Sequence, residues 1–173
     1  MVNITGTMDN TADTIDIGSG GLFLTGGLNQ LSGTIINGTL LSGDGTVLTS
    51  SSGTLDGVTL GTDLTESGAL FIRNSLTLAD GVVLDKGNST WYLTTTGSLP
   101  IAMVGGTGSA TINSTGGIIY SGYTISGQTL EIGSGVTLQG YGSLTDNTAA
   151  TIINNGTITG NTTGPTFTIT PAT

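Results

Sequence analysis

Short runs of alternating apolar and polar residues recur along the whole chain, and each run ends at Gly, Asn, Asp or Ser. The clearest runs are 14–17, 33–36, 53–55, 75–78, 129–132, 136–138 and 157–159. Alternation places successive side chains on opposite sides of an extended backbone, as in a β-strand with one buried face. The runs are shorter than the about 5–6 residues of a typical strand. The sequence therefore predicts an all-β fold of many short strands with frequent turns.

Charged residues are too scarce to supply the polar faces of surface helices. They make up 8% of the 173 residues, against about 25% in an ordinary soluble domain. Thr, Ser, Asn and Gly must cover the surface instead. Thr is β-branched and fits a pleated strand, whereas Gly and Asn suit turns with positive φ. No apolar run approaches the about 20 residues of a membrane-spanning helix, so we expect no transmembrane segment.

Composition also excludes several classes of site. The chain has no Cys and no His, so it has no thiol nucleophile, no zinc-thiolate site and no imidazole base. Two basic residues against a net charge of −9 leave almost nothing to attract a phosphate backbone. We therefore expect no nucleic-acid partner.

Similar segments return at intervals that indicate an imperfect repeat. Asp56-Gly57-Val58 resembles Asp80-Gly81-Val82, and the Thr-Ile-Ile-Asn run at 34–37 returns at 151–154. A repeat of roughly 20–24 residues is typical of solenoids. We interpret the chain as a right-handed parallel β-helix, or β-solenoid, of roughly eight coils and a length of about 35–40 Å, with three faces as its expected form. A β-sandwich is the alternative, which would need longer strands and fewer glycines.

The whole chain, 1–173, is expected to be a single β-solenoid segment. Residues 1–20 contain Asp9, Asp13 and Asp16, and could form an acidic cap or an incomplete first coil, because terminal repeats are expected to be polar and atypical. Residues 164–173 alternate between two prolines and are either an end strand or the start of a linker. The open ends of such a rod invite end-to-end self-association.

Acidic residues give the one candidate metal site. If the repeat register holds, Asp56 and Asp80 lie on adjacent coils, where a cation could bridge the two carboxylates. Calcium is the ion that such oxygen ligands suit, and it is the single cofactor we consider. Both residues precede Gly, so the alternative is a pair of solvent-exposed turn aspartates. Catalytic residues are not indicated, and we expect the chain not to be an enzyme.

The few aromatic residues are candidate ligand contacts. Trp91 and Tyr92 are consecutive, so on a strand they face opposite sides and one should point outward. Tyr120 and Tyr141 are separated by about one coil, so their rings could stack on one face. Exposed aromatic rings suit sugar rings or the apolar surface of a partner. Alternatively, Trp91 and Phe71 fill the core and the tyrosines cover its corners.

Two runs carry a family resemblance. The segments 151–160, Thr-Ile-Ile-Asn-Asn-Gly-Thr-Ile-Thr-Gly, and 130–138, Leu-Glu-Ile-Gly-Ser-Gly-Val-Thr-Leu, together with the Gly-, Thr- and Asn-rich composition, resemble passenger domains of bacterial surface proteins. These are the autotransporters and the large secreted adhesins of the filamentous-haemagglutinin type. The chain lacks the Asn-Pro-Asn motif of a two-partner secretion domain and a barrel-forming C-terminus, so an internal passenger fragment is the part it resembles.

The resemblance implies a right-handed parallel β-helix that is exported to the bacterial cell surface. The implied role is adhesive or structural, with a glycan or protein receptor on a host or neighbouring cell, and attachment to the outer membrane through parts not in this chain. Two alternatives stay open at this point. One is a carbohydrate-active or carbohydrate-binding β-helix protein, and the other is an ice- or surface-binding solenoid that would need a flat array of Thr-x-Thr pairs.

Overall fold

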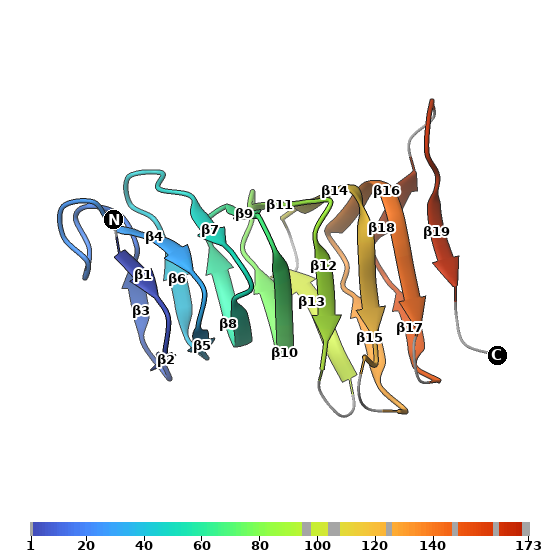
Figure 1. Ribbon diagram of the computed structural model, residues 1–173, viewed down its shortest axis with the longest axis horizontal. Coiled ribbons are helices and arrows are strands. Elements are labelled where there is room, and N and C mark those ends of the chain that lie inside the picture. The colour runs from blue at the N-terminus through green and yellow to red at the C-terminus, as the bar shows by residue number, and fades with distance from the viewer. Residues whose placement is uncertain are drawn as a thin grey trace.

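The fold is a long array of short parallel strands, seen in a computed structural model that describes residues 2–94, 98–103, 108–123, 126–146, 149–160 and 163–170 (Figure 1). The strands are β1 (Val2–Ile4), β2 (Thr7–Asp9), β3 (Thr14–Asp16), β4 (Leu28–Leu31), β5 (Thr34–Ile36), β6 (Thr39–Leu41), β7 (Leu48–Ser50), β8 (Thr54–Gly61), β9 (Leu64–Glu66), β10 (Ala69–Leu78), β11 (Val83–Gly87), β12 (Thr90–Leu93), β13 (Ser98–Met103), β14 (Ala110–Ser121), β15 (Thr129–Ile132), β16 (Val136–Asp146), β17 (Thr151–Asn154), β18 (Thr157–Gly160) and β19 (Phe167–Thr170).

Strand pairing divides this array into three parallel ladders. The first ladder joins β1, β4, β7, β9, β11, the first halves of β14 and β16, and β18. The second joins β2, β5, the first halves of β8 and β10, then β12, the second halves of β14 and β16, and β19. The third joins β3, β6, the second halves of β8 and β10, then β13, β15 and β17.

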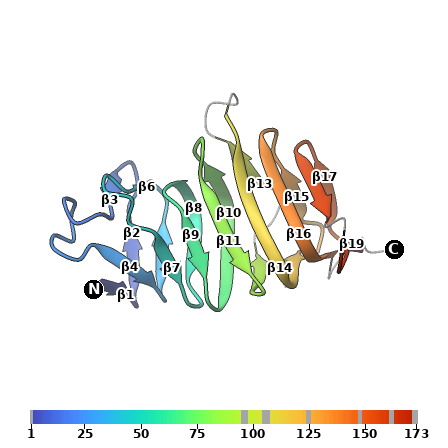
Figure 2. The ribbon, with the colours of Figure 1, turned by 90° about the horizontal axis from the view of Figure 1, so that it is seen from above.

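This pairing confirms a β-solenoid with three faces. The strands lie side by side along the long axis, with β1 and β19 at opposite ends of the rod (Figures 1 and 2). The strand pairings among the described residues are all parallel, so the alternative of a face-packed antiparallel sandwich is wrong. The right-handed sense and the number of coils stay predictions. Within the described residues, no helix has the length and apolar character needed to cross a bilayer.

Alternation along each strand builds the core. Leu40, Leu60 and Leu78 are register neighbours on the third ladder, and all three are fully buried. The threonine that precedes each leucine forms the matching outward column and is partly exposed. Each apolar side chain thus removes its surface from water against the coil before and after it, at about 25 cal/mol per Å² of apolar area. The hydroxyl groups stay at the surface, where water can satisfy them.

The corner between the second and third ladders shows why Asn and Gly end the strands. Asn37, Gly57 and Asn74 occupy this corner in three successive coils, all with positive φ, between 58° and 67°. Asn and Gly adopt this conformation at least cost. A Cβ atom on Gly57 would also lie 2.6 Å from Oδ1 of Asn37. The turn residues of the sequence are therefore the corners of the solenoid.

The coils differ in length more than the sequence repeat predicted. Register partners on the first ladder are 16 residues apart between Leu48 and Leu64, and 28 apart between Leu84 and Ile112. The similar Thr-Ile-Ile-Asn segments also lie on different ladders, with β5 on the second and β17 on the third. The repeated pattern therefore marks a strand and its turn, not one position in a coil, because any face accepts the same alternation.

Both ends of the chain contribute strands to the ladders. β1, β2 and β3 pair with β4, β5 and β6, so residues 2–16 form a coil rather than a separate acidic cap. At the other end β19 pairs with β16, so residues 167–170 form a strand of the second ladder rather than a linker. Residues 171–173 lie outside the described residues.

Candidate functional site

A stack of aromatic rings runs across three strands on the outside of the second ladder. The register sets Phe71 opposite Tyr92, and Tyr92 opposite Tyr120. The ring centroids of Phe71 and Tyr92 are 5.0 Å apart, and those of Tyr92 and Tyr120 are 5.7 Å apart, with interplanar angles of 19° and 12°. Tyr123 packs its ring against Tyr92 at a centroid distance of 4.4 Å. Tyr92 is the centre of the stack.

The structure shows which of the candidate aromatic contacts are buried and which face outward. Trp91 and Tyr92 do face opposite sides, as predicted, since Trp91 is fully buried in the core and Tyr92 lies in the outer stack. Burial removes Trp91 as a ligand contact. Phe71 was expected in the core as an alternative, and that was wrong, because it is partly exposed and stacks on Tyr92.

Tyr120 and Tyr141 do not form the predicted stack. Tyr141 is the register neighbour of Thr115, whereas Tyr120 lies between Tyr92 and Thr145. The prediction failed because it assumed a constant coil length. Tyr141 instead lines a separate surface hollow of about 440 Å³, together with Asp85, Asn113, Ser114, Thr115, Gln139, Gly140, Thr159 and Gly160.

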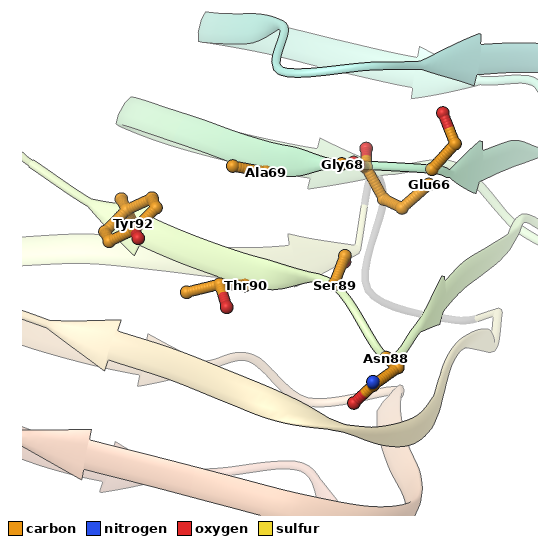
Figure 3. A pocket seen from close by; sticks show the side chains of 8 residues that line it. Glu66, Gly68, Ala69, Asn88, Ser89, Thr90 and Tyr92 are labelled. Atoms are coloured by element: carbon orange, nitrogen blue, oxygen red, sulfur yellow. The ribbon is translucent and has the colours of Figure 1, made fainter.

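A larger hollow, of about 560 Å³, lies beside Tyr92 where the chain turns from the first ladder to the second. Its lining residues are Glu66, Ser67, Gly68, Ala69, Asn88, Ser89, Thr90 and Tyr92. They belong to two successive corners, one between β9 and β10 and the next between β11 and β12. Figure 3 shows the two chain segments with the hollow's side chains, Tyr92 at one end and Asn88 at the other.

An extra residue in the second corner accounts for this hollow. Leu64 pairs with Leu84 before the corner, and Leu70 pairs with Trp91 after it. The connection from Leu84 to Trp91 is therefore one residue longer than the connection from Leu64 to Leu70. The longer corner therefore stands away from the shorter corner of the preceding coil. It packs tightly against the corner of the following coil, because a Cβ on Gly117 would collide with the carbonyl oxygen of Ser89.

Two ionisable side chains are buried next to this hollow. Glu66 is 8% exposed and Lys86 is fully buried. Nζ of Lys86 donates hydrogen bonds to the carbonyl oxygens of Ser89 and Gly116, at 2.5 Å and 2.7 Å. Both carboxyl oxygens of Glu66 are inaccessible to solvent, and the carboxyl group lies near the hydroxyl of Ser50, its register neighbour, and near the charge of Lys86. Lys86 thus fixes the backbone of two corners, while Glu66 lies against Ser50 and Lys86 on the buried face.

Burial shifts the pKa of both groups towards their neutral forms. It raises the pKa of Glu66 from 4.5 to about 8, and the nearby Ser50 hydroxyl and the charge of Lys86 oppose only part of that rise. Burial likewise lowers the pKa of Lys86 from 10.5 to about 8, against the attraction of Glu66. Moving either charge out of water is costly because the interior replaces its hydration poorly.

The two aspartates of the predicted calcium site do not stack. The register sets Asp56 opposite Arg73, and the side chain of Asn74 donates to Oδ1 of Asp56. Asp80 follows β10 at a different corner, where its Oδ1 accepts a hydrogen bond from the Ser109 backbone at 2.8 Å. Their sequence similarity was misleading because Asp-Gly ends strands on more than one ladder. In the described part of the chain, no three His, Cys, Asp or Glu side chains are grouped to hold a metal ion.

Two acidic residues in the first coils, Asp16 and Asp44, accept hydrogen bonds from backbone and hydroxyl groups of their own turns and of neighbouring turns. Asp16 accepts hydrogen bonds from the backbone of Gly18 and Gly43, at 2.8 Å and 3.0 Å. Asp44 accepts from the backbone and hydroxyl groups of both Ser19 and Thr46, and these bonds hold its pKa well below the usual range. These carboxylates link neighbouring turns.

Three residues of this region were not predicted from the sequence: Glu66, Lys86 and Tyr123. A signal for the first two was present, because Glu66 follows Leu64 by two residues and Lys86 follows Leu84 by two. In a strand this spacing puts each charged side chain on the buried face. Tyr123 lies beyond the end of β14, and alternation carries no information on the position of its ring.

No protein-family model, curated protein or solved structure matched this chain when it was compared with known proteins.

Proposed function

We propose that this chain is a structural and adhesive segment of an exported bacterial surface protein and that it has no enzymatic activity. The observation that supports this most is the surface of the rod. Three parallel ladders carry outward Thr, Ser and Asn side chains on an apolar core, and one ladder carries a stack of aromatic rings. A rigid, elongated, polar rod separates its ends and offers long faces for contact.

The charge distribution supports a passive rather than a catalytic role. Hydrolysis of a glycosidic bond needs two carboxyl groups about 5–9.5 Å apart across a groove. The lining of the hollow beside Tyr92 contains one carboxyl group, that of Glu66. Among the described acids, Asp16 and Asp44 already accept hydrogen bonds from the backbone of their own or a neighbouring turn. The net charge of −9 keeps such a rod soluble.

Location and adhesion can be tested separately. An antibody raised against residues 1–173 should label intact cells of the source organism as strongly as permeabilised ones. Beads coated with the folded chain should adhere to host epithelial cells or to neighbouring bacteria several-fold more than beads coated with the heat-unfolded chain. Labelling that requires permeabilisation would contradict export, and equal adhesion of the two bead types would contradict an adhesive role.

A further inference from the structure

We propose that the last coil of the rod, formed by β17, β18 and β19, binds the first coil of a second copy of this chain, so that rods join head to tail. The inference goes beyond the proposed adhesive role and does not depend on it. The two surfaces are those of β1 to β3 and of β17 to β19, which lie at opposite ends of the long axis (Figure 1).

The last coil presents an apolar hollow and three strand edges. Among the described strands, β17, β18 and β19 pair only with strands of the preceding coil, so their outer edges can accept a further strand. Ile152 and Ile158 lie opposite the buried Leu130 and Leu138 of that coil. A hollow of about 780 Å³ opens over them, and its lining residues are Ala150, Thr151, Ile152, Asn154, Ile158, Gly160, Phe167 and Ile169.

The first coil presents the matching surface. Among the described strands, β1, β2 and β3 pair only with β4, β5 and β6 of the following coil. Val2, Ile4 and Met8 pack against the core and are still partly exposed. The first coil of one copy, placed on the last coil of another, continues the parallel ladders in the same direction. Two identical ends placed together would instead make the strands antiparallel.

The order of the faces determines how the two copies fit. The chain visits the first, second and third ladders in turn, and β17, β18 and β19 belong to the third, first and second ladders. The face that follows β19 is therefore that of the third ladder, where β17 is the last described strand. A second copy turned by one face sets its β1 on β17, its β2 on β18 and its β3 on β19, which leaves no gap in any ladder.

The spacing of residues supports this register. Segments 2–8 and 152–158 each have an apolar residue at the first and seventh positions and a Gly-Thr pair at the fifth and sixth. Within the rod, Gly-Thr pairs of this kind lie on successive coils, since Thr7 is the register partner of Thr34. In the proposed contact, the Gly-Thr pair of the second copy lies on that of the last coil in the same way.

Gly6 faces open space at the place where an inner coil meets its neighbour. A Cβ on Gly33 would collide with the carbonyl oxygen of Gly6 in the preceding coil, whereas a Cβ on Gly6 would have no atom within 4 Å. In the proposed contact, Gly6 of the second copy takes the place of Gly33, and Gly156 takes the place of Gly6. The missing side chain lets the two corners approach closely.

The distribution of charge favours the joining of unlike ends. Asp9, Asp13 and Asp16 belong to the first coil, whereas the sequence from 147 to 173 contains no charged residue. Two first coils placed together would bring like charges into one interface, which is destabilising. The uncharged last coil meets the acidic first coil without this repulsion.

The test measures the mass of chain 1–173 by analytical ultracentrifugation over a range of concentrations. We expect the mass to rise with concentration from one copy to several, and electron micrographs to show single-file rods of increasing length. Met8→Asp at one end and Ile158→Asp at the other should each weaken association at least about tenfold, because each buries a carboxylate at the interface. Thr59→Asp adds the same charge outward on the third ladder and is the matched control, which should associate as the unsubstituted chain does.

A mixture of the two end variants tests the direction of joining. Each variant alone should stay monomeric. Each also retains one intact end, so the mixture should form a dimer and nothing larger. Circular dichroism and the fluorescence of Trp91 show whether each variant is folded. Gly6→Ala adds one methyl group where no atom lies within 4 Å, so it should keep the stability of a single copy and weaken association.

Four results would overturn the proposal. The first is an unsubstituted chain that stays monomeric at millimolar concentration, and the second is a mixture of folded end variants that stays monomeric. The third is a dimer of Ile158→Asp alone, which would show first coils joining each other, or of Met8→Asp alone, which would show the same of last coils. If either end variant fails to fold, Gly6→Ala decides, and unchanged association of that variant is the fourth contrary result.

Discussion

Tyr92 and Tyr120 stack with ring centroids 5.7 Å apart and planes 12° from parallel, although they lie on separate coils. The parallel pairing of β12 with β14 sets the two residues opposite each other. Successive coils repeat at about 4.8 Å, which is close to the spacing that stacked rings adopt. Outward aromatic residues at the same register position in successive coils are therefore brought to stacking distance by the coil spacing alone.

Replacing the central ring should destabilise the rod. Tyr92→Ala removes contacts with Phe71, Tyr120 and Tyr123, and at about 0.5–1.5 kcal/mol for each of the three aromatic pairs we expect a loss of about 1.5–4.5 kcal/mol. Tyr141→Ala is the control, since Tyr141 has no ring partner in the described part of the chain, and should lose less. Urea unfolding followed by circular dichroism measures both. Equal losses would contradict a role of the stack in stability.

Trp91 should report on the core. It is the single tryptophan and is fully buried, so its fluorescence should be blue-shifted in the folded chain and move to longer wavelength on unfolding. Trp91→Ala should cost about 3–5 kcal/mol, as large-to-small core changes do. Trp91→Phe should cost less, because Nε1 of Trp91 has no hydrogen-bond partner to lose. A native emission maximum typical of exposed tryptophan would contradict its burial.

The buried pair of Glu66 and Lys86 should give the rod a stability minimum near pH 8. The pKa of Glu66 is about 8 in the folded chain against 4.5 ordinarily, so between these values the folded state retains a proton that the unfolded state has lost. The free energy of unfolding then falls as the pH rises. The pKa of Lys86 is about 8 in the folded chain and 10.5 ordinarily, so between pH 8 and 10.5 the unfolded state keeps a proton on Lys86 that the folded state has lost. The free energy of unfolding therefore rises again over this range.

Urea unfolding at pH 5, 8 and 10 measures this profile. We expect the chain to be less stable at pH 8 than at pH 5 by about 1 kcal/mol or more, since one pKa unit corresponds to about 1.4 kcal/mol. Glu66→Gln should abolish the fall between pH 5 and pH 8, whereas Thr65→Val, an exposed neighbour on β9, should keep it. A Glu66→Gln profile that matches the unsubstituted chain would show that Glu66 does not cause the fall.

Close packing of the corners should make some glycines irreplaceable. Gly140 has a φ of 110°, and a Cβ there would collide with the carbonyl oxygen of Ser114 on the neighbouring strand. Gly140→Ala should therefore cost more than about 2 kcal/mol, through both backbone strain and the collision. Gly6→Ala is the control, because its Cβ would have no atom within 4 Å, and should change stability by less than about 0.5 kcal/mol. Similar melting temperatures for the two variants would contradict the packing of this corner.

The fold was predictable because its signals are local. Alternation at 39–41 and 76–78 determines which side chains face inward, and the Asn and Gly residues after the strands determine where the chain turns. The opposite orientations of Trp91 and Tyr92 followed from the same rule. The alternation of residues within a strand gives no information on how many residues each corner has. The predictions that assumed the same number of residues in every coil were therefore wrong. These were the stacking of Tyr120 on Tyr141 and the pairing of Asp56 with Asp80.

The sequence by itself determined that this chain forms short strands around an apolar core with a hydroxyl-rich surface. Only the tertiary structure decided which residues of neighbouring coils lie opposite one another. It brought Tyr92 onto Tyr120, placed Glu66 near Lys86, and opened a hollow where one corner is a residue longer than its neighbour. The physical reason is that parallel ladders align strands by their hydrogen bonds and inward side chains, while the corners absorb every difference in length.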